Sequence, residues 1–260
     1  VCLGGSGKAN GIAKMVDGGY EITGYWNYAT GAAHATVFTA NCVIEQEGNT
    51  LKDKDGNSIV RSFLFFKEEV TLHKSWNCMG MKGTSSDSFE VKQLFVNNDR
   101  AFVIDKAGAI LEDAIYQYPF LHFAEVTLAV NICGMAFRFL DLYEELVKER
   151  DNTGQSVTRV LSKETALFLE AKKEAFKTSR ELFYAAVMYS WEACVGNNGE
   201  VFCGLLQTVS QTSRELAANA RQLVDELYPY CGLAAANPDN EINRVWRNLH
   251  TASQHPLLLY

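Results

Sequence analysis

The chain has 260 residues and a formal net charge of −7. Lysine and arginine are interspersed with acidic residues, which excludes the basic stripe of a nucleic-acid-binding protein, and the uninterrupted apolar runs are too short to span a membrane. The seven cysteines are odd in number and form no C-x-x-C pair, a usage that favours reduced thiols in a cytoplasmic protein over a disulfide framework or a metal site.

The first informative segment is residues 16–35, VDGGYEITGYWNYATGAAHA. Its Asp-Gly-Gly start is a turn signal, and the following residues alternate with the two-residue period of a strand. Thr30-Gly31 ends this strand where the main chain can approach a ligand closely, because glycine has no side chain to hold the ligand away. An edge hairpin whose aromatic residues only fill a core is the alternative. The pattern places Tyr20, Ile22, Trp26 and Tyr28 on one side of the strand and Glu21, Thr23 and Asn27 on the other.

Further strand patterns follow at residues 36–39, 58–66 and 89–96, and residues 53–57 carry turn chemistry. These patterns predict a small antiparallel β-domain over residues 1–117.

The chain changes character at Tyr118-Pro119. Apolar residues then recur at spacings of three and four over residues 121–146, a stripe typical of a long helix packed against others. Further helices are predicted from an N-cap at Ser162 to about Cys194, from about Glu200 to Leu227, and from Pro238 to the region of His255. We therefore expect an α+β protein in which residues 118–260 form an antiparallel four-helix bundle.

The terminal helix has two faces that differ in composition. His255 precedes Pro256, so the helix is expected to end there, with its dipole favouring the imidazolium form of His255. A solvent histidine would satisfy the same pattern. On a helical projection, Trp246, Leu249, His250 and Ser253 share one face, while Asn248, Thr251 and His255 share the opposite face with Arg244 nearby. We expect His250 to pack or hydrogen-bond within the bundle.

Two more segments complete a set of three motifs. Residues 75–91 read SWNCMGMKGTSSDSFEV, and residues 244–255 read RVWRNLHTASQH. Trp26 and Trp76 are separated by about fifty residues. In this order, the motifs resemble the middle β-domain and terminal helix of the acyl-CoA dehydrogenase superfamily, and their wording is most similar to the branch of two-component flavin-dependent monooxygenases.

The resemblance implies an enzyme that uses reduced flavin, FAD or FMN, supplied by a separate flavin reductase, and O₂ to hydroxylate a small aromatic or amine substrate. It implies that His255 is the catalytic base and that Thr30 donates a hydrogen bond beside the flavin N5. The resemblance also implies that the chain forms a homotetramer. The implied cofactor-binding residues are Trp26, Asn27 and Tyr28 through their main chain, Thr30 through its hydroxyl, and Trp76 as an aromatic wall.

Two alternatives stay open. Acyl-CoA dehydrogenation needs a carboxylate base, for which Glu226 and Glu241 lie in the approximate region, although the sequence lacks the family's YEGT context. The resemblance also implies an N-terminal helical domain that this sequence does not contain, so a non-catalytic oligomerisation module is the second alternative. The sequence leaves the substrate and the choice between FAD and FMN undecided.

Overall fold

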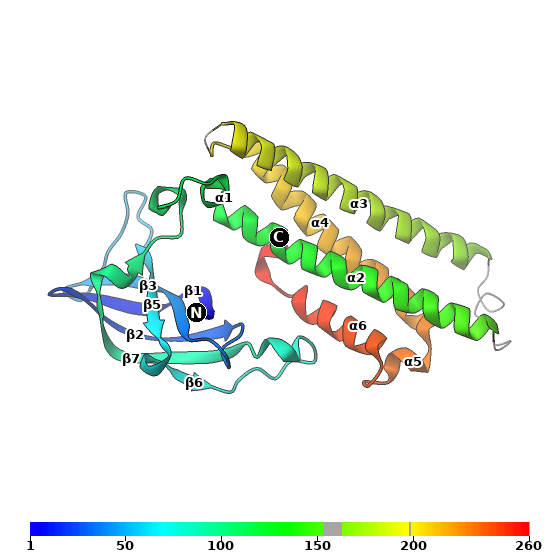
Figure 1. Ribbon diagram of the computed structural model, residues 1–260, viewed down its shortest axis with the longest axis horizontal. Helices are drawn as coiled ribbons and strands as arrows, with labels where there is room; N and C mark the ends of the chain where they lie inside the picture. Colours follow the sequence, from blue (N-terminus) through cyan, green and yellow to red (C-terminus); the bar gives the residue numbers. More distant parts are fainter. Residues whose placement is uncertain (153–162, 198, 260) are drawn as a thin grey trace. The chain divides into compact units, whose positions relative to one another are not determined.

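The computed structural model describes residues 1–152, 163–197 and 199–259. It divides into two compact units (Figure 1). Val1–Cys78 and Lys82–Gly108 form the first, here called the sheet unit, and Met79–Met81 and Ala109–Tyr260 form the second, here called the helical unit. The sequence analysis expected the β-domain to reach residue 117, but the sheet unit ends at Gly108. The residues that follow belong to the helical unit, where α1 (Ala114–Gln117) packs against α3 (Lys163–Gly196). The α+β class, with a sheet followed by a helical bundle, is confirmed.

The sheet unit contains one eight-stranded sheet in the order β6-β7-β2-β1-β3-β5-β8, with β4 paired to β3. Most neighbours are antiparallel, but β1 and β3 are parallel, which departs from the antiparallel domain expected. The reason is that β1 and β2 form a hairpin, and β3 then joins the free edge of β1 instead of that of β2. The strands are β1 (Leu3–Val16), β2 (Gly19–Ala29), β3 (Val37–Gln46), β4 (Asn49–Thr50), β5 (Val60–Phe66), β6 (Thr71–His73), β7 (Asp87–Asn97) and β8 (Ala101–Phe102).

Trp26 is the centre of the sheet unit's core. Its side chain is fully buried and stacks on Phe89 with ring centroids 5.2 Å apart. Its indole N–H donates to the carbonyl of Asn41 at 3.0 Å, so the polar atom of the ring is satisfied. The ring lies against two glycines: a Cβ built on Gly11 would be 2.2 Å from Trp26 Cζ2, and one on Gly24 would be 2.5 Å from its Cη2. The side chain of Trp26 therefore belongs to the core, and only its main chain can face a ligand.

We expect Gly11→Ala to lower the free energy of unfolding by about 1–3 kcal/mol, because the added methyl group forces the buried indole to move. Gly7→Ala is the matched control in the same strand, since a Cβ there meets nothing within 4 Å. Urea unfolding of both variants measures the effect. Equal stability of the two variants would contradict the close packing of the Trp26 ring against Gly11.

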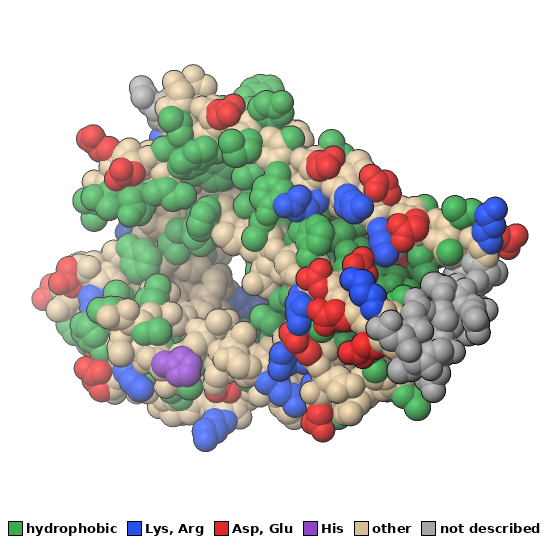
Figure 2. Space-filling model, turned by 45° about the vertical axis from the view of Figure 1, so that its right-hand side comes forward, with side chains coloured by type: hydrophobic (Ala, Val, Ile, Leu, Met, Phe, Trp, Pro, Cys, Tyr) green, Lys and Arg blue, Asp and Glu red, His purple; other side chains and the backbone are tan. Residues whose placement is uncertain are grey.

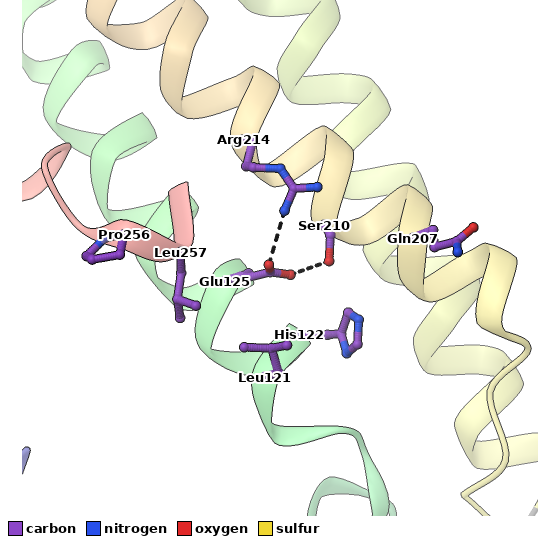
Figure 3. Close-up of a pocket in the computed structure, with 8 residues that line it drawn as sticks. All are labelled: Leu121, His122, Glu125, Gln207, Ser210, Arg214, Pro256 and Leu257. Carbon is purple, nitrogen blue, oxygen red and sulfur yellow. Dashed lines mark hydrogen bonds and ion pairs between the residues drawn. The ribbon is translucent and has the colours of Figure 1, made fainter. Parts of the chain in front are cut away.

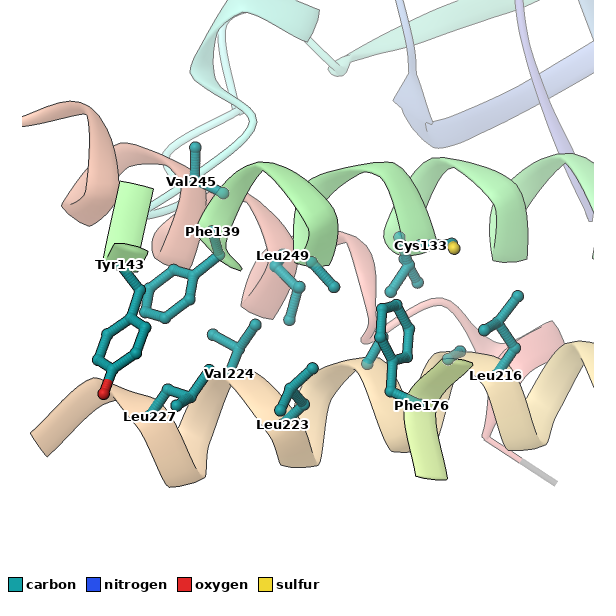
Figure 4. Close-up of a cluster of buried hydrophobic side chains, with 14 of the residues drawn as sticks. Cys133, Phe139, Tyr143, Phe176, Leu216, Leu223, Val224, Leu227, Val245 and Leu249 are labelled. Carbon is teal, nitrogen blue, oxygen red and sulfur yellow. The ribbon is translucent and has the colours of Figure 1, made fainter. Parts of the chain in front are cut away.

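The helical unit is built from α2, α3, α4 and α6, and apolar side chains fill the space between them (Figure 4). The apolar stripe predicted from residue 121 lies on α2, where Ile132 and Phe139 are buried. Ser162, the expected cap of the next helix, lies outside the described residues. Pro238 does not start the terminal helix, because Asn237 Oδ1 accepts from the N–H of Asp239 in a turn before it. The helices are α1, α2 (Phe120–Asn152), α3, α4 (Cys203–Leu227), α5 (Leu233–Ala236) and α6 (Glu241–Ala252).

By length and composition, α2 is also apolar enough to cross a membrane, with a mean hydropathy of 1.5 over an 18-residue window. The uninterrupted runs in the sequence did not indicate this, because Glu125 and Arg138 break them. In the structure both charges are paired, Glu125 with Arg214 and Arg138 with Glu241, and α2 packs against α4 and α6. Of the 18-residue window that is this apolar, 28% is buried in the structure.

Candidate functional site

A cluster of hydroxyl groups lies where β2 ends. Thr30 Oγ1 is 3.0 Å from Ser86 Oγ, which is 2.7 Å from Thr84 Oγ1. The N–H of Gly31 donates to the carbonyl of Thr84 at 2.8 Å. The structure therefore brings together the first two motifs of the sequence, residues 16–35 and 75–91, at the hydroxyl of Thr30.

The same two segments also supply a pair of aromatic side chains. The Tyr28 and Trp76 rings meet edge to face, with centroids 6.0 Å apart, and Asn27 Oδ1 accepts from Ser88 Oγ at 3.1 Å. Tyr28 is 58% exposed, so the prediction that it shares the face of buried Trp26 is wrong. The physical reason is its positive φ of 68°, which reverses the alternation, and the register between β2 and β7 shifts between Trp26 and Ala29.

Asp87 fixes the segment that contains Trp76. Its Oδ1 accepts from the N–H groups of Ser75 and Trp76, each at 2.9 Å, and its Oδ2 accepts from Ser85 Oγ at 2.9 Å. The bond from the Trp76 N–H, followed by those from Ser85 and Ser75, lowers the pKa of Asp87 although partial burial opposes the shift. Sequence reasoning did not single out Asp87, because its contribution is to hold the loop in place.

These bonds predict a pH dependence of stability. A carboxyl group with a lowered folded-state pKa contributes stability above its unfolded pKa, and that contribution is lost as the pH falls through the folded pKa. We therefore expect Asp87→Asn to be less stable than the wild type at neutral pH and to lose less stability between about pH 5 and pH 3. Urea midpoints measured across this range check the prediction, and parallel pH profiles for the two proteins would contradict it.

His255 lies beyond the end of α6, not in its last turn. The helix ends at Ala252, and His255 instead caps the short 3₁₀ helix Pro256–Leu258, with Nδ1 accepting from the N–H of Leu257 at 3.3 Å. The residue is exposed overall, but the protein packed around part of the ring lowers its pKa. The expected stabilisation of the imidazolium by the α6 dipole is therefore wrong, because the helix ends too early for its last carbonyls to act on the ring.

His250 is a packed residue of the bundle. It is buried, its ring centroid lies 4.3 Å from that of Trp246, and its Nε2 is 3.0 Å from Asp225 Oδ1. Burial lowers the pKa of His250 while the Asp225 carboxylate opposes that shift. The packing role expected for His250 is confirmed.

The opposite face of α6 binds the segment Met79–Met81 from the second motif. A Cβ on Gly80 would be 2.1 Å from the carbonyl oxygen of Arg247, so the main chain lies directly on the helix. Both segments belong to the helical unit. Three hydrogen bonds hold the contact: Gly80 N–H to Thr251 Oγ1 at 3.1 Å, Met81 N–H to Asn248 Oδ1 at 2.6 Å, and the Arg247 guanidinium to the Met79 carbonyl at 3.1 Å.

A pocket of about 460 Å³ opens in the helical unit between α2, α4 and the two residues that follow His255 (Figure 3). Leu121, Pro256 and Leu257 supply apolar walls, and its other lining residues are His122, Glu125, Gln207, Ser210 and Arg214. The sequence offered one unused signal for it, a carboxylate at residue 125 inside the apolar stripe of α2.

Glu125 is the most buried polar residue of this pocket, with 4% of its surface exposed. Its Oε1 lies 3.3 Å from the Arg214 guanidinium, and its Oε2 accepts a short hydrogen bond from Ser210 Oγ. The pair brings one negative and one positive charge to the pocket wall. A buried carboxylate without such partners would cost several kcal/mol, about 3–5 when one partner is removed, so the cluster acts as a unit.

The chain matches the family model described as acyl-CoA dehydrogenase, C-terminal domain, over residues 126–259, about half of its length. It is also similar to the oxygenase subunit HsaA of a flavin-dependent monooxygenase from Mycobacterium tuberculosis. The two are 27% identical over 266 residues, covering 94% of this chain and 62% of the relative. The chain thus spans less than two thirds of the length of that relative.

Two solved structures share the fold. The crystal structure of the HsaA monooxygenase from M. tuberculosis superimposes with a TM-score of 0.82 at 20% identity, over 99% of this chain and 66% of that one. XiaF from Streptomyces sp., solved in complex with FADH₂ and glycerol, gives 0.79 at 20% identity, over 98% of this chain and 65% of that one.

Proposed function

The chain belongs to the acyl-CoA dehydrogenase family, and from that premise we propose that it is the oxygenase component of a flavin-dependent monooxygenase that hydroxylates a small aromatic or amine substrate. The observation that carries the proposal is the hydroxyl cluster of Thr30, Thr84 and Ser86, which joins two motifs at an open end of β2. The similarity to HsaA and the FADH₂ complex of XiaF support it.

The residues at the end of β2 fit a planar ring with a polar edge. Asn27 and Tyr28 stand outside the register with β7, and a Cβ on Gly31 would meet nothing within 4 Å, so the main chain there is approachable. When bound, the reduced flavin would supply the electrons that activate O₂. The main chain of Trp26, Asn27 and Tyr28 would hold the ring edge, the Thr30 hydroxyl would donate to it, and Trp76 would form a side wall.

His255 is the proposed base for the substrate hydroxyl or amine. Its lowered pKa keeps the imidazole neutral at pH 7, which a base requires. The bond from the Leu257 N–H to Nδ1 is long at 3.3 Å, so this nitrogen can exchange that partner for a substrate proton. While the Leu257 bond is intact, the neutral ring carries its proton on Nε2 and acts as a donor.

The test is a reductase-coupled assay of the intact protein with reduced FAD or FMN and ¹⁸O₂. The proposal expects substrate-dependent incorporation of ¹⁸O, and it fails if the protein binds neither flavin or releases only H₂O₂ with every phenol and amine tried. Bleaching of bound oxidised flavin by an acyl-CoA thioester would favour dehydrogenation instead. Of the two candidate bases for that alternative, Glu226 and Glu241, the second is engaged by both Nε and Nη2 of Arg138, at 3.1 and 2.9 Å.

We also propose that the helical unit assembles with further copies of the chain. Apolar side chains gather on its surface (Figure 2). They lie outside the core of the bundle, and large exposed apolar patches of this kind mark interaction surfaces. A tetramer is the first expectation and a dimer the second. Light scattering that finds only monomers at micromolar concentration would contradict this. The exposed side chains on α2 and α3 include Phe120, Phe123, Val130, Leu167, Phe168, Leu182, Met188, Tyr189 and Val195.

A further inference from the structure

The positive charge in the wall of the pocket is already paired with a carboxylate of the protein. Arg214 is the cation in its wall, and the carboxylate of Glu125 lies against it while Ser210 holds the other carboxylate oxygen. Figure 3 shows the two contacts converging on Glu125 from α4. An anionic ligand would find the guanidinium neutralised and would also meet a buried carboxylate, so the pocket disfavours negative charge.

His122 gives the pocket a hydrogen-bonding group that the protein does not use. Its Nδ1 is buried without a partner among the described residues, so a ligand cannot reach that nitrogen, and Nε2 is the one left to bind a ligand. A buried N–H without an acceptor is costlier than an empty lone pair, so the ring proton belongs on Nε2. The ring lies between α2 and the α4 residues Ser210 and Gln207 (Figure 3), where Nε2–H can donate to a ligand oxygen.

We propose that this pocket binds an uncharged, largely apolar ligand through a hydrogen bond from His122 to its oxygen, and that Glu125 determines specificity by keeping Arg214 from carboxylates. The apolar walls of Leu121, Pro256 and Leu257 contact the body of the ligand. The inference rests on the proposed function in so far as the ligand is the substrate. The binding itself requires no flavin.

The test compares two probes of one ring system, 2-naphthol and 2-naphthoate, by calorimetric titration of the chain at pH 7. Wild-type protein is expected to bind 2-naphthol at least about tenfold more tightly than 2-naphthoate. Glu125→Gln keeps the size of the side chain and releases Arg214, so 2-naphthoate should gain about tenfold or more while 2-naphthol changes little. His122→Phe should weaken 2-naphthol by about tenfold.

Two controls separate the contributions. The double variant Glu125→Gln with Arg214→Gln removes both charges and should not gain affinity for 2-naphthoate, which identifies Arg214 as the cause. Glu170→Gln removes the same charge from an exposed carboxylate that pairs with Lys173 on α3, and it should leave both affinities unchanged. If Glu125→Gln does not fold, as far-UV circular dichroism would reveal, His122→Phe and the double variant still test the ligand class.

Equal wild-type affinity for the two probes, or a 2-naphthoate affinity that does not respond to Glu125→Gln in folded protein, would overturn the inference. Its failure is distinguishable from failure of the proposed function. Selective binding without ¹⁸O incorporation would contradict the monooxygenase alone, and ¹⁸O incorporation without selectivity would contradict the pocket assignment alone.

Discussion

Replacing His255 with alanine in the intact protein is expected to lower substrate hydroxylation by about a hundredfold or more, the range for loss of a general base. Flavin binding and oligomeric state should stay near wild type, because the side chain is exposed and caps only a short 3₁₀ helix. H₂O₂ release should rise, since reduced flavin and O₂ would still react without transfer of oxygen to the substrate. Coupled assays that measure product and peroxide together test this.

The pH profile provides an independent check. A base acts when it is unprotonated. Because the pKa of His255 is lowered, its ring stays unprotonated at pH values down to and somewhat below the usual histidine pKa of about 6.5. Wild-type kcat/KM is therefore expected to fall only below that pH, and the acidic limb should disappear in His255→Ala.

His250→Ala is the matched control in the same segment. It should leave the flavin chemistry intact and lower the free energy of unfolding by about 1–3 kcal/mol, because it removes a buried ring that packs on Trp246. An equal loss of activity from both substitutions would contradict the assignment of His255 as the base. A folding defect from His255→Ala alone would contradict it as well.

Gly80→Ala is the second substitution with a large expected effect. Its methyl group would stand 2.1 Å from the Arg247 carbonyl oxygen, which is main chain and cannot rotate away. The segment Met79–Met81 would have to leave α6 and lose its hydrogen bonds to Asn248 and Thr251. We expect the free energy of unfolding to fall by about 1–3 kcal/mol, as measured in urea.

Gly83→Ala controls for the loss of glycine in the same motif. A Cβ there meets nothing within 4 Å, so this variant should match the wild type. If Gly80→Ala is as stable as Gly83→Ala, the close contact with α6 does not stabilise the protein.

Periodicity was enough to predict the two classes of secondary structure. The apolar stripe over residues 121–146 lies on α2, because the side chains that face the bundle recur with the period of the helix. Periodicity says less about where an element ends. The terminal helix was expected from Pro238 but begins at Glu241, since a side-chain bond from Asn237 to the Asp239 N–H holds the preceding residues in a turn.

The candidate site was predictable only in part. The side on which Tyr28 lies depends on one left-handed residue, which no alternation pattern contains. The pocket combines residues from α2, α4 and the segment after α6, so spacing along one helix could not predict it. Glu125 alone gave a signal, a charge within an apolar stripe, and a buried charge in such a stripe needs a partner from another element.

The central position of β1 has a consequence for the handling of this protein. β1 separates β6, β7 and β2 from β3, β5 and β8, and it pairs with β2 on one side and β3 on the other. Without β1 the sheet would split, and both β2 and β3 would present open edges of unpaired amide and carbonyl groups. Such edges recruit strands from other molecules, so a shortened version of the chain that begins after Val16 is expected to aggregate.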